Sequence, residues 1–155
     1  MMNASAMLLL HQPTRHNSLR EGVRLGIIMA SATWLWVALV DAVAGQPFHT
    51  FDALGGIAVF TVMHYLLNIA YGVALVSVIH GAEHAPSLMM GVIFGGIILE
   101  GGITMITNIL VQTVVGTVGW IGIFGGSLIA LAIAITLLAH THPLADYVRR
   151  AEEEI

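Results

Sequence analysis

The residues best suited to chemistry are polar side chains placed inside long apolar segments. Two groups of them recur at steps of three or four residues, the spacing that puts side chains on one face of a helix. The first group is Thr61, His64, Asn68 and Tyr71, and the second is Glu100, Thr104, Asn108 and Gln112. Polar residues deep in a membrane usually face a partner or a water-filled cavity. We therefore expect a buried polar site where these two faces meet.

His64 and Glu100 are the strongest candidates for that site. If the helices that carry them are antiparallel neighbours, a rise of 1.5 Å per residue places the two at depths that differ by about 6 Å, so they can pair. One hypothesis is a structural hydrogen bond that fixes helix register. A second is a proton, ion or substrate site that also uses Asn68, Tyr71, Thr104 and Asn108. A third is a metal or haem ligand, although no other span supplies a second histidine at this depth.

A second cluster of titratable residues is predicted at one rim of the membrane domain. Its members are His80, Glu83, His84, His140 and His142. Imidazole and carboxylate groups at this spacing suit zinc or another borderline divalent metal, and histidine also titrates near neutral pH. The alternative is that these side chains are solvated or face lipid headgroups. They are weak metal candidates, and no particular cofactor is identified.

The composition shows what surrounds these residues. Of 155 residues, 57% are hydrophobic, five are arginine, none is lysine and nine are acidic, and the mean hydropathy is +0.90. A soluble domain carries about 25% charged residues, whereas this chain carries 9%. The chain is therefore expected to be an integral membrane protein. A soluble enzyme and a nucleic-acid binder are excluded, and the lack of cysteine excludes disulfides and thiolate metal sites.

Four membrane-spanning helices are predicted, at about 25–45, 54–80, 88–115 and 119–139. The uncharged segments 53–82 and 101–145 provide the length, because a span needs about 20 apolar residues. Turn-forming residues separate the spans at Gly45-Gln46-Pro47, Ala85-Pro86-Ser87 and 116–120. Short connections make neighbouring helices antiparallel. The expected fold is an all-α, four-helix transmembrane bundle over 25–139, between tails at 1–24 and 140–155.

The arginines orient this bundle. All five lie in the two tails, so the positive-inside rule places both termini in the cytoplasm. The protein is then a multi-pass protein of the inner (cytoplasmic) membrane. A cleaved signal peptide is the alternative, since Ala42-Val43-Ala44 follows an apolar run. Asp41 and the long charged segment before that run argue against cleavage.

Glycines at four-residue spacing indicate where helices approach closely. The pairs are Gly22-x-x-x-Gly26, Gly91-x-x-x-Gly95 and Gly122-x-x-x-Gly126. Such pairs bring two small residues to one helix face and allow close backbone packing in membranes. We expect packing within the bundle, with a homo-oligomer or partner interface as the alternative.

Several residues carry a resemblance to a group of small uncharacterised bacterial four-helix integral membrane proteins. They are Arg20-Glu21-Gly22, Gly26, Trp36, Asp41, Gly45-x-Pro47-Phe48, Leu54-Gly55, His80, Pro86, Gly91 and Glu100. The resemblance covers about residues 20–140. It implies the four-helix topology and assigns no catalytic residue.

The leading functional hypothesis is a non-enzymatic accessory or scaffold protein. In this hypothesis the chain lies in the lipid bilayer and either self-associates or joins a larger membrane complex, with His64 and Glu100 as a buried polar pair. The alternative is a small proton-coupled transporter or ion-binding protein that uses the same two residues. A metal- or haem-binding redox protein is the third hypothesis.

Overall fold

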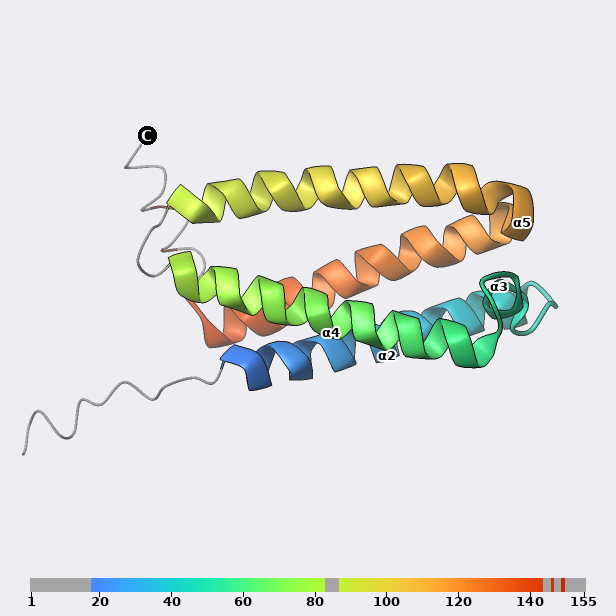
Figure 1. Ribbon diagram of the computed structural model, residues 1–155, viewed down its shortest axis with the longest axis horizontal. Coiled ribbons are helices and arrows are strands. Elements are labelled where there is room, and N and C mark those ends of the chain that lie inside the picture. The colour runs from blue at the N-terminus through green and yellow to red at the C-terminus, as the bar shows by residue number, and fades with distance from the viewer. Residues whose placement is uncertain (1–17, 83–86, 144–145, 147–148, 150–155) are drawn as a thin grey trace, which may run out of the picture.

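The computed structural model is all-helical over the residues that it describes, which are 18–82, 87–143, 146 and 149. Its elements are α2 (Ser18–Val43), α3 (His49–Ala53), α4 (Ile57–Ala82) and α5 (Ser87–Thr141) (Figure 1). Within 87–115 the structure describes side chains only at Gly91, Ile98, Gly102, Met105 and Ile109. The predicted all-α class is confirmed, because no strand occurs in any described segment.

The long helix α5 consists of two parts that meet at Gly116. This residue has φ 66° and ψ −167°, which is not a helical conformation. Glycine adopts a positive φ at little cost because it has no Cβ. The chain reverses there, and the two parts of α5 run in opposite directions (Figure 1). The reversal falls in the segment 116–120, where the sequence predicts a tight turn.

Two segments differ from the sequence expectation. α2 begins at Ser18 and thus includes the arginine-bearing segment before the predicted span. Glu21 lies in its first turn, where a negative charge interacts favourably with the helix dipole. The predicted loop at 46–53 contains the short helix α3. Hydropathy located the apolar part of each helix, but helices extend beyond it wherever backbone hydrogen bonds can continue.

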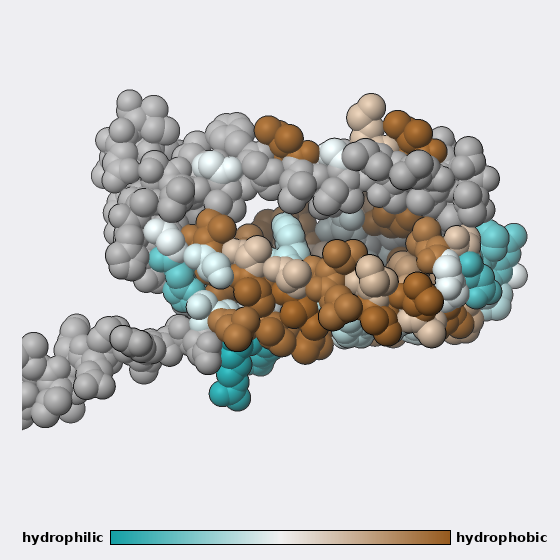
Figure 2. Space-filling view, in the orientation of Figure 1, coloured by the Kyte–Doolittle hydropathy of each residue, from teal (hydrophilic) through white to brown (hydrophobic). Residues whose placement is uncertain are grey.

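Three described helices are long and apolar enough to cross a membrane: Ser18–Val43, Ile57–Gly81 and Gly116–Thr141. Large apolar side chains are exposed along them, such as Leu35 at 64% and Leu67 at 64%. Hydrophilic residues gather at the two ends of the described surface, and a hydrophobic band lies between these ends (Figure 2). Helices that are apolar on all sides are typical of membrane spans. The structure therefore indicates a membrane protein.

The helix α2 packs against both α4 and α5 and lies at the centre of the described contacts. Against α4 the contact is between backbones. A Cβ added to Gly22 would lie 2.5 Å from Cα of Val73, and one added to Gly26 would lie 2.5 Å from Cα of Ile69. A Cβ added to Gly72 would meet the Gly22 carbonyl oxygen. The first predicted glycine pair thus serves packing within the chain.

The second part of α5 packs on another face of α2. Here the helix contributes glycines and α2 contributes side chains: Gly125 lies against the Trp36 ring and Gly126 against Thr33. The Thr33 hydroxyl also donates a hydrogen bond to the Gly126 carbonyl at 3.3 Å. All three helices share a core of buried apolar side chains, formed by Leu25, Met29, Val76, Ile79, Ala134 and Leu138.

We predict that Gly72→Ala destabilises the protein and that Gly91→Ala does not. The new methyl group at position 72 would meet the backbone of α2, which cannot move aside as a flexible side chain could. Overpacking of this kind costs about 1–3 kcal/mol. At Gly91 no described atom lies within 4 Å of an added Cβ, so alanine should gain helix propensity there. Thermal unfolding in detergent, followed by circular dichroism, measures both; equal midpoints for the two variants would contradict the prediction.

Candidate functional site

The polar face of α4 is directed at α2. Its side chains form hydrogen bonds across the interface with groups of α2. The pairs are Trp34 Nε1–H donating to Thr61 Oγ1 at 3.0 Å, Ser31 Oγ with the Tyr65 hydroxyl at 2.9 Å, and His64 Nε2 with the Ala30 carbonyl at 3.2 Å. Interhelical hydrogen bonds of this kind stabilise bundles in lipid, where no water is available to replace them.

His64 lies at the centre of this polar face. Because the Ala30 carbonyl can only accept, Nε2 must carry the hydrogen, and the neutral ring then presents Nδ1 as an acceptor. The Asn68 Nδ2 lies 3.4 Å from Nδ1 and also donates to the His64 carbonyl at 2.9 Å. The imidazole stacks on Phe60, with centroids 5.2 Å apart and planes 11° apart. The described contacts of His64 thus orient its ring toward α2.

The structure does not describe most of the side chains that were predicted to join His64 in one site. The side chains of Glu100, Thr104 and Asn108 lie outside the described residues, so a His64–Glu100 pair stays a prediction. Tyr71 belongs to the same predicted stripe, but its side chain is 39% exposed.

A buried carboxylate near the end of α2 connects this helix to α3, which follows in the chain. Asp41 is 1% exposed. Its Oδ2 accepts the backbone N–H of Thr50 at 2.8 Å, and its Oδ1 accepts the Thr50 hydroxyl at 2.6 Å. The first backbone N–H groups of a helix have no partner within the helix, and Asp41 supplies one for α3. No such contact of Asp41 was predicted from the sequence.

Aromatic rings pack around this connection. Phe51 is fully buried between Trp34, 5.0 Å away, and Phe60, 4.9 Å away. Phe48 has φ 64°, a conformation unusual for a bulky residue, and its ring contacts both Trp34 and Phe51. Phe51 is therefore part of the core at this end of the bundle.

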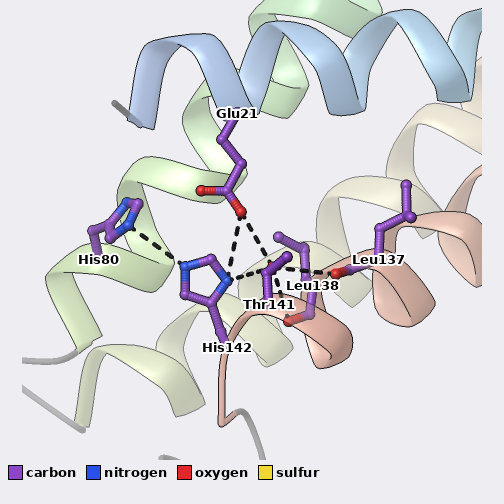
Figure 3. Close-up of polar contacts among 6 residues, drawn as sticks. All are labelled: Glu21, His80, Leu137, Leu138, Thr141 and His142. Carbon is purple, nitrogen blue, oxygen red and sulfur yellow. Dashed lines mark hydrogen bonds and ion pairs between the residues drawn. The ribbon is translucent and has the colours of Figure 1, made fainter. Parts of the chain in front are cut away.

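At the other end of the bundle, three titratable residues from three helices converge. Glu21 comes from the start of α2, His80 from the end of α4, and His142 directly follows α5 (Figure 3). One ligand atom from each lies within 4.8 Å of the other two. We call these residues the Glu21 triad. The rim histidines His80 and His142 were weak metal candidates, and the structure brings them together with an acid that the sequence analysis did not select.

Hydrogen bonds fix the orientation of this triad. Thr141 Oγ1 lies 3.2 Å from Glu21 Oε1 and 2.8 Å from His142 Nδ1. His142 Nε2 is 3.5 Å from His80 Nε2, and His142 Nδ1 is 3.7 Å from Glu21 Oε1. The His142 side chain is 5% exposed and that of Glu21 is 19% exposed. The arrangement joins two imidazoles and one carboxylate at a largely buried position.

The remaining rim candidates are not all in this cluster. His140 is exposed and lies outside the triad, while Glu83 and His84 lie outside the described residues. Glu21 was missed because it is far from the histidines in sequence. A useful signal existed: Glu21 is an acid at the same predicted end of the bundle as His80 and His142.

No protein family matches the chain, and no curated protein or solved structure is similar to it. The resemblance described from the sequence thus stays a prediction. The function proposed below is argued from the sequence and from the contacts of the described residues.

We predict that Asp41→Ala strongly destabilises the protein. The change would leave the buried Thr50 N–H and hydroxyl without their acceptor, and losing hydrogen bonds to a charged group costs roughly 2–4 kcal/mol. Asp41→Asn should cost less, because an amide can accept from the Thr50 N–H and donate to its hydroxyl. Asp52→Ala, at an exposed position in α3, is the control. The unfolding midpoint should fall most for Asp41→Ala; a midpoint equal to that of Asp52→Ala would refute this role.

Proposed function

We propose that this chain is a non-enzymatic accessory or scaffold protein of the cytoplasmic membrane that associates with a second copy of itself. In this proposal it crosses the membrane four times, with both parts of α5 as spans. All five arginines lie before residue 25 or after residue 148, outside the predicted spans, and this placement supports two cytoplasmic termini.

The observation that carries the proposal is an uncovered apolar face on the first part of α5. Ile98, Met105 and Ile109 are 73%, 67% and 64% exposed. With Gly91 and Gly102, also exposed, they follow steps of three, four or seven residues and therefore share one face of the helix. No described atom lies within 4 Å of a Cβ added at Gly91 or Gly102. Small residues on an open face allow a second helix to approach closely in lipid.

The contrast with the other glycines supports this assignment. At Gly22, Gly26 and Gly72 the backbone of the facing helix fills the space that a side chain would need. At Gly126 the Thr33 side chain fills it. Those glycines serve packing within the chain. Gly91 and Gly102, the two described glycines of the first part of α5, have no such contact, so a partner helix is the natural occupant of their face.

The described polar side chains also favour a structural role over transport. Thr61 and His64 bond to α2 across the interface. A transport pathway needs polar groups that exchange partners with a moving ion or substrate. The transporter alternative therefore depends on Glu100, whose side chain is outside the described residues.

We predict that Gly102→Leu weakens self-association while leaving the fold intact. Leucine has a higher helix propensity than glycine by about 1 kcal/mol, so the helix itself should not suffer. The added bulk would instead block close approach of a second helix. Ala74→Leu, at an exposed position on α4, is the matched control. Native mass measurement after gentle solubilisation should give a multiple of the 16.5 kDa chain for the wild type and the control, and mostly monomer for Gly102→Leu.

Two results would overturn this proposal. The first is a wild-type chain that is monomeric in native lipid. The second is an oligomer that Gly102→Leu leaves unchanged. A complex with a different protein would favour the partner-subunit form of the accessory role.

A further inference from the structure

We propose that Glu21, His80 and His142 bind a divalent metal ion of the borderline class, for which Zn²⁺ is the appropriate probe. The proposal is independent of self-association, because it rests on residues at the end of the bundle and not on the face of α5. Two imidazoles and one carboxylate are a ligand set that zinc uses in proteins, with a water completing four-coordination. Glu21 comes from α2, His80 comes from α4, and His142 directly follows α5 (Figure 3).

The spacing of the two imidazoles fits a shared ion. In a tetrahedral zinc site with bonds of 2.0–2.1 Å, two nitrogen ligands lie about 3.3–3.4 Å apart. The Nε2 atoms of His80 and His142 are 3.5 Å apart. The full set of ligand atoms spans up to 4.8 Å, so the carboxylate would need to move toward the ion. The flexible Glu21 side chain can do so by rotation about its own bonds.

The hydrogen bonds of His142 prepare it for this role. Its Nδ1 lies 2.8 Å from Thr141 Oγ1. When Nδ1 donates to that hydroxyl, the ring's lone pair is on Nε2, the atom that lies toward His80. Metal-binding histidines usually donate their other ring N–H to an oxygen, which fixes the tautomer and the ring orientation. The Thr141 hydroxyl is such an oxygen for His142.

The carboxylate supplies the second, independent indication. Glu21 Oε2 is buried and has no hydrogen-bond partner among the described residues. Its other oxygen accepts from Thr141. The neighbouring arginines Arg20 and Arg24 are exposed, and the ion pairs among the described residues join neither of them to Glu21. A buried carboxylate oxygen is costly to leave unpaired, and a divalent cation beside two neutral imidazoles would compensate it.

A metal at this position would join the three helices where their ends meet. α2 begins there, α4 ends there and α5 ends there. An ion that binds the folded bundle but not the unfolded chain stabilises the folded state by mass action. The expected consequence is a thermal midpoint that rises with Zn²⁺.

The test is Zn²⁺ binding to the full chain, purified in detergent through an affinity tag that contains no histidine and stripped with a chelator. The variants are His80→Gln, His142→Gln and Glu21→Gln, and the matched control is His140→Gln, an exposed histidine two residues before His142. Competition against a chromophoric chelator gives affinity and stoichiometry. Thermal unfolding with equimolar Zn²⁺ or Mg²⁺ gives a second readout, because Mg²⁺ prefers oxygen ligands.

We expect one tight Zn²⁺ per chain in the wild type and in His140→Gln. Each triad variant should bind at least about 10- to 100-fold more weakly, since removal of an outer-shell partner alone costs that much. Zn²⁺ should raise the unfolding midpoint of the wild type and not that of Glu21→Gln, which is nearly isosteric and should fold. The proposal is overturned if the wild type binds no stoichiometric Zn²⁺, or if His140→Gln loses the site while the triad variants retain it.

Discussion

The close approach of α2 and α4 is the constraint on which the other described features depend. It exists only because Gly22, Gly26 and Gly72 have no side chains, so that the two backbones meet directly. At this separation the short polar side chains of α4 can reach α2. His64 bonds to a main-chain carbonyl of α2, a contact that a wider helix spacing would not permit. The glycines therefore determine both the packing and the polar interface.

Lipid explains why the polar groups lie where they do. In the hydrocarbon core an unpaired polar group has no water to bond with, so each must find a partner in the protein. Along α2 and α4 the partners are supplied by the neighbouring helix, as with Trp34 and Thr61. At the bundle ends the constraint relaxes, and charged groups such as Asp41 and Glu21 occur there. Asp41 is satisfied by Thr50, whereas one oxygen of Glu21 lacks a described partner.

Much of the fold could be predicted from the sequence, because apolar length and glycine position are local signals. The helical class and the reversal at Gly116 follow from such signals. The direction in which a polar stripe faces is a different matter, since it depends on how each helix rotates against its neighbours. The stripe of His64 was expected to face the helix of Glu100. Its described contacts across a helix interface are with α2, and the side chain of Glu100 lies outside the described residues. Periodicity identifies the shared face of a helix but not its partner.

The Glu21 triad shows the same limit at longer range. The sequence selected His80 and His142 because histidines stand out in apolar surroundings, but it gave no reason to join them to an acid near the start of α2. That link appears only when three helix ends are placed together. Helices that alternate in direction bring the start of one helix and the end of the next to the same end of a bundle, so residues distant in sequence become neighbours there. In a small membrane protein with few charged residues, these ends are where a ligand set can be assembled without placing a charge deep in lipid.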